Sequence, residues 1–308
     1  MRIWVYFATA LFCLGSTGCI QKIMLNGELA ATRQASPAIE TIGDYELLRE
    51  VVPASLAQLE GMHRLGPKNE DGLFMLAMGW AGYGYGFVEE DMEAATADGK
   101  EELAAYHKKR ATDAYSRAVR YGLEHMSHKA EGFEAVSIDD AKLRKWLEKN
   151  FTDKEDAEIL FWTGYAWLAR AGLLREDNAV MEQIYVGIAM LERSRTLDPE
   201  YNHWTATIAI ASYYGSSPLL GFMDKAKSMF EESLKKTDKK ALSVQLSYAT
   251  YYFCNTGDEK SYDKYIEEVL AADDPDPEQR ATNSVAKRRA VRWKTKKWKY
   301  DNCGFERR

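Results

Sequence analysis

Cys19 lies in a sequence context that predicts covalent lipid attachment. Arg2 and the amino terminus supply positive charge, an apolar run covers residues 3–14, and small residues at 15–18 lead to the cysteine. Such a run is too short to span a bilayer but is typical of a signal peptide. We therefore expect cleavage before Cys19 and acylation of its thiol. Ser16 occupies a position where these signals usually carry leucine, so an ordinary secretory signal cut elsewhere is the alternative.

A lipidated Cys19 predicts a periplasmic protein that its acyl chains anchor to a membrane. Ile20 follows the cysteine, where an aspartate would favour retention in the inner membrane, so the outer membrane is favoured over the inner one. No later segment reaches 18 consecutive apolar residues. We therefore expect the rest of the chain to lie outside the bilayer.

Two further sets of side chains are candidates for covalent or metal chemistry. Cys254 and Cys303 remain in the folded part and are candidates for a disulfide in an oxidising compartment, although the sequence does not show that they lie close together. His125 and His128 are three residues apart, but a zinc site needs more ligands than this pair. We expect a surface pair of histidines and no metal.

The sequence contains no motif for nucleophilic, metal-dependent, phosphate-binding or dinucleotide chemistry. We therefore expect no catalytic residues, no cofactor and no enzymatic activity. A glycine-rich stretch, 82–86, alternates glycine with tyrosine, and neither a strand nor a lysine accompanies it. Close helix packing or a helix end explains such glycines. The alternative is a concave or pore-facing surface for a ligand, with candidate contacts Tyr83, Tyr85, Trp162 and Tyr165.

Composition shows which kind of fold must position these residues. Hydrophobic residues make up 46% of the 308 residues, which excludes global disorder. No proline lies between Pro67 and Pro199, and long helices tolerate such a gap better than a loop-rich β-sandwich. The net charge of −6 does not favour nucleic-acid binding. The basic segment 287–308 predicts a capping helix with a solvated face, and contact with anionic headgroups is the alternative.

Internal repeats indicate an all-α fold. The segment 191–197 resembles 115–121, and the pattern recurs at 230 and 266, at offsets of 39 and 36 residues. An aromatic-rich segment of helical periodicity precedes each of these, at 73–85, 159–171, 204–214 and 242–253. Two helices per unit at this period predict a tetratricopeptide-like helical repeat array. Charged segments at 87–110 and 122–156 are expected to be insertions that form extra helices or long loops.

Gly79 and Gly164 lie on the first helices of these pairs, where a small residue lets the second helix approach closely. We divide the chain into a signal peptide (1–18), a lipidated tether with partial helix (19–43) and an α-helical body with a basic C-terminal helix and tail (44–308).

Several segments together resemble the TatT family, the periplasmic lipoprotein T component that accompanies some TRAP transporters. The resemblance covers about residues 44–298 and is carried by 74–91, 114–122, 160–167, 190–201, 218–221 with 226–231, and 283–290. One position and one segment depart from the family pattern. Phe222 replaces a second small residue, and 293–296 replaces leucines, so the final helix is expected to pack differently.

The resemblance implies a homotrimer of tetratricopeptide-like subunits that enclose pores. It also implies docking of the periplasmic solute-binding P component and delivery of a small ligand to it, hydrophobic ligands included. A repeat scaffold for outer-membrane or envelope assembly is the alternative function. An envelope enzyme, such as a glycan-cleaving one, would need a catalytic carboxylate in a groove, and no motif selects one.

Overall fold

The computed structural model describes residues 20–216 and 218–305, so Cys19 lies outside the described residues. All regular structure in these ranges is helical, and none of their residues lies in a strand. The all-α class predicted from the sequence is confirmed. No helix within these ranges is long and apolar enough to cross a membrane.

The helices follow one another with short connections. After a helical segment at 20–35 and a 3₁₀ turn, η1 (Ser36–Thr41), the first half contains α2 (Tyr45–Leu65), α3 (Glu70–Tyr83), α4 (Glu89–Ala97), α5 (Glu101–Lys129), α6 (Phe133–Val136), α7 (Asp140–Asn150) and α8 (Asp156–Leu173). The second half contains α9 (Asn178–Met181), α10 (Ile184–Leu197), α11 (Tyr201–Gly215), α12 (Met223–Lys236), α13 (Leu242–Tyr248), α14 (Cys254–Thr256), α15 (Glu259–Ala271), α16 (Arg280–Trp293) and α17 (Lys296–Cys303).

Capping residues fix where several of these helices begin. Asp44 accepts a hydrogen bond from the Leu47 amide at the start of α2, and Asn69 accepts one from Gly72 at the start of α3. Asp139 and Asp258 cap α7 and α15 in the same way. Each cap satisfies a backbone N–H that has no partner within the helix, which stabilises a helix start by about 1 kcal/mol.

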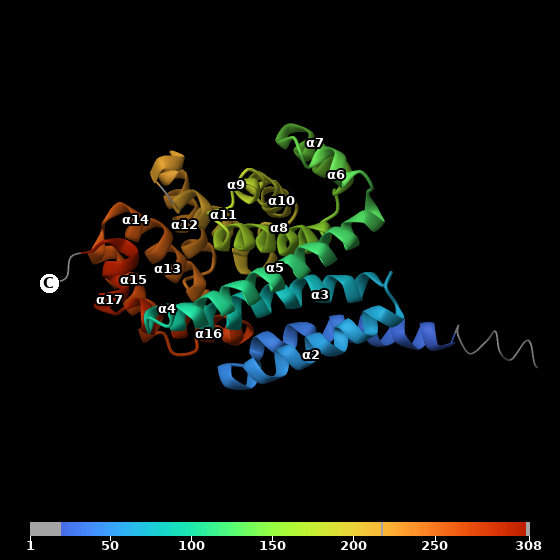
Figure 1. Cartoon of the computed structure of the whole chain (residues 1–308), viewed down its shortest axis with the longest axis horizontal. Helices are drawn as coiled ribbons and strands as arrows, with labels where there is room; N and C mark the ends of the chain where they lie inside the picture. Colours follow the sequence, from blue (N-terminus) through green and yellow to red (C-terminus); the bar gives the residue numbers. More distant parts are fainter. Residues whose placement is uncertain (1–19, 217, 306–308) are drawn as a thin grey trace, which may run out of the picture.

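The long helices pack side by side in an array (Figure 1). Helix α3 packs on α2 and α5, α5 packs on α8, and α8 packs on α10, before α11, α12, α13 and α15 continue the array. At its end, α16 contacts η1 and α2, so the last long helix returns to the first elements of the chain. Figure 1 shows α16 beside α2 and α4 although about 200 residues separate them.

The segment expected as a first insertion, 87–110, is not an insertion. A π-helical turn, η2 (Gly84–Val88), joins α3 to α4 without a break, and 101–110 is the beginning of the 29-residue α5. The second expected insertion, 122–156, contains the end of α5 and the small helices α6 and α7. These two helices lie at one edge of the array (Figure 1).

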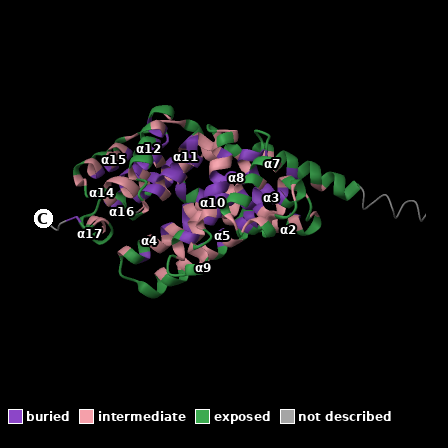
Figure 2. Cartoon of the chain, turned by 90° about the horizontal axis from the view of Figure 1, so that it is seen from above, coloured by how far each residue is buried: buried purple, intermediate pink, exposed green. Residues whose placement is uncertain are grey.

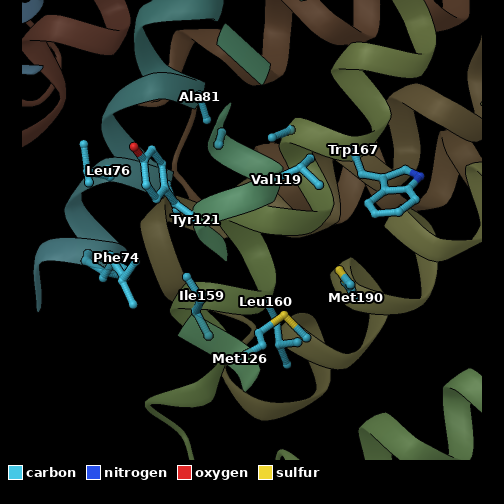
Figure 3. Close-up of a cluster of buried hydrophobic side chains, with 14 of the residues drawn as sticks. Phe74, Leu76, Ala81, Val119, Tyr121, Met126, Ile159, Leu160, Trp167 and Met190 are labelled. Atoms are coloured by element: carbon cyan, nitrogen blue, oxygen red, sulfur yellow. The ribbon is translucent and has the colours of Figure 1, made fainter. Parts of the chain in front are cut away.

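A hydrophobic core runs between α3, α5, α8 and α10 (Figure 3). Its fully buried side chains include Leu76, Tyr121 and Leu160. Burying one such large apolar side chain stabilises the fold by roughly 1.5–3 kcal/mol. This core holds the helices that carry the candidate ligand contacts.

Gly164 lets α8 and α10 cross closely, as the sequence predicts for it. A Cβ atom at Gly164 would lie 2.9 Å from the carbonyl oxygen of Gly187 on α10, and a Cβ at Gly187 would lie 2.9 Å from the Gly164 carbonyl. Gly79 faces the preceding helix instead, because its Cβ would meet the side chain of Leu56 on α2 at 2.8 Å.

The predicted tether segment is helical over residues 20–35, and its Leu29 is fully buried in the core. Arg33 on this helix pairs with Asp71 and Glu158 at 3.0 and 2.7 Å. The helix is therefore packed against the body along its second half. Its first turns are exposed and project beyond the body (Figure 2).

Candidate ligand-binding site

Two π-helical turns carry tyrosines into the interior of the array. The first is η2 (Gly84–Val88), which contains Tyr85, and the second is η4 (Ala249–Phe253), which contains Tyr251. A π turn widens the helix by one residue and is found frequently at functional sites. The glycine-tyrosine run at 82–86 is thus a π turn within a continuous helix rather than a helix end.

Glycines are required where the π turns meet neighbouring helices. A Cβ at Gly84 would lie 2.9 Å from the ring of Tyr115 on α5. A Cβ at Gly215, at the end of α11, would lie 2.6 Å from the carbonyl oxygen of Tyr251. A larger residue at either position would force the π turn or the group that it contacts to shift.

Side chains bind carbonyl groups of both π turns, and those at the first π turn come from distant helices. Arg289 on α16 donates a hydrogen bond of 2.8 Å to the Tyr85 carbonyl, and Tyr45 on α2 donates one of 3.0 Å to Gly86. In η4, Asn255 donates one of 3.1 Å to the Tyr251 carbonyl. These three carbonyl groups of the π turns are therefore satisfied within the protein.

An acid–arginine cluster joins α4 to α16. It consists of Glu89, Glu90, Glu93, Arg288, Arg289 and Arg292. The Glu90 carboxylate accepts from Arg289 at 3.1 Å and from Arg292 at 2.7 Å, and its side chain is only 2% exposed. Arg289, with 5% exposure, also pairs with Glu89 at 3.2 Å. Three arginines of α16 thus face three carboxylates of α4, where the last long helix returns to the first half of the array.

Burial and charge oppose each other in this cluster. Burial raises the pKa of Glu89, while Arg289 and a hydrogen bond of 2.7 Å from the Tyr115 hydroxyl act to lower it. Burial acts to lower the pKa of Arg289, but the charges of Glu93, Tyr85 and Glu89 bring it above its usual value. Arg289 therefore stays charged, and its charge is neutralised inside the protein.

Three of the four predicted ligand contacts lie together next to this cluster. The half-buried Tyr85 and Tyr165 have ring centroids 6.1 Å apart, and Trp162 lies 6.4 Å from Tyr165. The guanidinium of Arg289 covers the Tyr85 ring at 4.1 Å. Trp162 donates a hydrogen bond of 2.9 Å to the hydroxyl of Tyr201.

Tyr83, the fourth candidate, has a different environment. Its hydroxyl accepts a hydrogen bond of 2.6 Å from Arg110, and its ring contacts Trp80 and Phe87. A helix turns by about 200° over two residues, so Tyr83 and Tyr85 point in nearly opposite directions. We predicted them as contacts of one surface because they are neighbours in the chain.

Tyr251 belongs to the same group and was not predicted. Its pKa is raised to about 12, mainly by burial and then by the charge of Glu89, while the charge of Arg289 acts to lower it. Burial likewise raises the pKa of Tyr165 well above its usual value. We call Tyr85, Tyr165, Tyr251 and Trp162 the aromatic cluster. The aromatic run at 251–253, at the end of a first helix like 83–87, was the available signal.

Within residues 20–216 and 218–305, no hydrogen-bond partner is found for the hydroxyls of Tyr85, Tyr165 and Tyr251, although each side chain keeps some exposed surface. The guanidinium of Arg289 beside them is already paired with the carboxylates of Glu89 and Glu90. The cluster therefore offers aromatic faces and hydroxyl groups rather than a free charge.

The other predicted sites have clear structural surroundings. Cys254 and Cys303 form a disulfide with Cα atoms 4.8 Å apart, which ties α17 to α14. His128 lies 3.8 Å from Glu70, and burial lowers the pKa of His125. No group of three or more potential metal ligands occurs in the described part of the chain.

The basic C-terminal segment pairs with acids of the body. Lys299 contacts Glu259 at 2.7 Å and Asp263 at 2.9 Å, and the arginines of α16 belong to the acid–arginine cluster. Trp293, in the segment that departs from the family pattern, stacks on Trp298 with ring centroids 5.5 Å apart. Much of the local positive charge is thus neutralised intramolecularly.

Comparison with protein families identifies this arrangement. Residues 42–300 match the family described as TRAP transporter T-component. A search of curated proteins gives no match. The family is a transporter accessory family. Because the match covers most of the 308 residues, the chain belongs to the TRAP transporter T-component family, whose members are subunits on the periplasmic side of these transporters.

Proposed function

We propose that this T component binds the solute-binding P component of its transporter and helps deliver a small ligand to it. The observation that carries the proposal is the aromatic cluster. The hydroxyls of Tyr85, Tyr165 and Tyr251 have no hydrogen-bond partner within residues 20–216 and 218–305, and they lie beside Arg289, whose charge is paired with Glu89 and Glu90. Aromatic faces with a few polar groups are typical of small-molecule sites. The aromatic rings suit an apolar ligand, and the hydroxyls orient any polar group that it carries.

The proposal includes the location and assembly of the subunit. Residues 1–18 are removed as a signal peptide, Cys19 is lipidated, and residues 19–43 connect the anchor to the body at 44–308. The protein is held at a membrane, with the outer membrane favoured, and assembles as a homotrimer. Family membership supports this transport role over a scaffold for envelope assembly.

Small molecules that remain bound to the purified protein test the proposed site. We expect native mass spectrometry to detect a small molecule on the wild-type chain and much less of it on Tyr85→Phe/Tyr165→Phe. These changes remove the hydroxyls and keep the rings. The exposed Tyr106→Phe is the matched control. Equal retention by both variants, or a ligand that crosslinks elsewhere, would contradict the assignment of the site.

Replacement of Cys19 tests the anchor separately. We expect Cys19→Ala to abolish lipid labelling and to release the protein from membranes. Unchanged membrane retention of this variant would contradict the lipoprotein assignment and would leave the ligand site unaffected.

A further inference from the structure

The N-terminal helix, residues 20–35, has two faces with different surroundings. On one face Leu29 is fully buried, Leu25 is half-buried and Arg33 is paired with acids of the body. Asn26 also accepts a hydrogen bond of 3.0 Å from Asn69. This face fixes the helix to the body.

The opposite face carries an apolar stripe of Ile20, Ile23 and Met24. These side chains are 56%, 70% and 68% exposed. At about 100° per residue, the spacing of three and four residues gathers them on the side of the helix opposite Leu29. Exposure of large apolar side chains to water is unfavourable, and a group of them on one side of a helix is typical of a surface that contacts a partner or a membrane.

The stripe ends after little more than one turn. Further along the same side, the helix carries Gly27, Ala31 and Gln34, which are small or polar. A partner helix would be expected to use the whole side, whereas a partner that touches only the tip of the helix needs large apolar residues there alone. The tip is also the part that projects beyond the body (Figure 2).

We propose that the apolar stripe of Ile20, Ile23 and Met24 inserts into the surface of the lipid bilayer. This inference rests on the proposed lipidation, because Cys19 directly precedes the stripe. Amphipathic helix ends bury apolar side chains about 5–10 Å into the boundary between headgroups and acyl chains. The exposed Lys22 in the same turn reaches the level of the lipid phosphates.

The consequence is a fixed orientation. A lipid on a flexible tether would let the body tumble above the membrane. Here the stripe fixes the tip of the helix in the bilayer, and Leu29 and Arg33 fix its other half to the body. The aromatic cluster would therefore keep one direction relative to the bilayer, which assists docking of a periplasmic partner.

A fluorescent probe on the stripe tests this inference. The lipidated protein carries Ile23→Cys labelled with an environment-sensitive dye, because Cys19 is then acylated and Cys254 and Cys303 are paired. It is reconstituted in phosphatidylethanolamine and phosphatidylglycerol vesicles that contain doxyl-labelled lipid. We expect several-fold stronger quenching at position 23 than at the control Ala35→Cys, which is exposed near the far end of the helix.

Further arms separate the alternatives. Adding Ile20→Ser and Met24→Ser should reduce quenching at position 23 to the control level, although the lipid remains. Equal quenching at positions 23 and 35 on a chain that carries lipid would overturn the inference. Shielding of position 23 in the Cys19→Ser protein without vesicles would assign the stripe to a second copy and overturn it too. Mass spectrometry of the same samples reports whether Cys19 is lipidated. A missing lipid is thereby distinguished from a stripe that does not insert into the bilayer.

Discussion

Arg289 covers the ring of Tyr85 at 4.1 Å and donates a hydrogen bond of 2.8 Å to the carbonyl group of the same residue. This pair joins the last long helix to the first π turn, across 204 positions of sequence. The side chain of Arg289 therefore positions a candidate ligand contact, Tyr85, and also joins the end of the helical array to its first half. The stability of the closure and the geometry of the site should depend on each other.

Loss of Arg289 should destabilise the fold strongly. Arg289→Met leaves Glu90 with one arginine fewer in a buried position. Removing one partner of a buried ion pair typically costs about 3–5 kcal/mol. We expect a decrease of that order in the free energy of unfolding, measured with denaturant. Arg288→Met is the matched control, because Arg288 is half exposed and should cost under about 1 kcal/mol. Equal losses in the two variants would contradict the role of Arg289 as the closing residue.

The crossing of α8 and α10 should tolerate no methyl group. Gly164→Ala places a Cβ within 2.9 Å of the Gly187 carbonyl, so the helices must move apart. We expect destabilisation by roughly 1–3 kcal/mol in thermal or denaturant unfolding. Gly172→Ala, in the same helix with open space around it, should be neutral or stabilising by up to about 1 kcal/mol. If Gly164→Ala behaves like Gly172→Ala, the close crossing is wrong.

The disulfide should contribute to stability through the unfolded chain. Cys254 and Cys303 are 49 positions apart, and a crosslink over a loop of that length stabilises a protein by about 4 kcal/mol in the chain-entropy description. We expect a reducing agent to lower the unfolding midpoint of the wild-type protein. The same reagent should have no effect on Cys254→Ser/Cys303→Ser. A wild-type midpoint that is insensitive to the reducing agent would contradict the bridge.

Glu60 should make stability sensitive to acid. Burial acts to raise its pKa, but hydrogen bonds from Tyr121, Trp80 and Arg117 lower it to below its ordinary value of 4.5. Because its folded-state pKa is depressed, its contribution is present above about pH 4.5 and is lost as the pH falls through the lower value. Glu60→Gln should therefore lose less stability than wild type as the pH falls below about 4.5. Parallel pH profiles for the two proteins would argue against this.

The helices could be predicted from the sequence because their periodicity is local. Gly164 was also predictable, since a glycine amid aromatic residues on a helix indicates close packing. The π turns could not be predicted, because a π turn uses the same residue types as an α-helix, and the glycines at 82–86 indicated only that something local was unusual. The interpretation of 87–110 as an insertion was wrong for this reason.

The acid–arginine cluster was hidden by distance along the chain. Glu90 and Arg289 each lie in a charged stretch that looks like a solvated helix face, and no local pattern shows that they meet. The only signal was global, a basic segment of +8 at 287–308 in a chain of net charge −6. Tyr251 was missed in a similar way, because its relation to Tyr85 depends on how two distant π turns pack.

Co-purification from native membranes tests the central claim most directly. The lipidated chain is captured after mild crosslinking, and its partners and assembly mass are identified by mass spectrometry. We expect a periplasmic solute-binding protein of a TRAP transporter to be enriched, with a trimeric T component. Capture of envelope-assembly factors instead, or a monomer without any solute-binding protein, would contradict the proposed function.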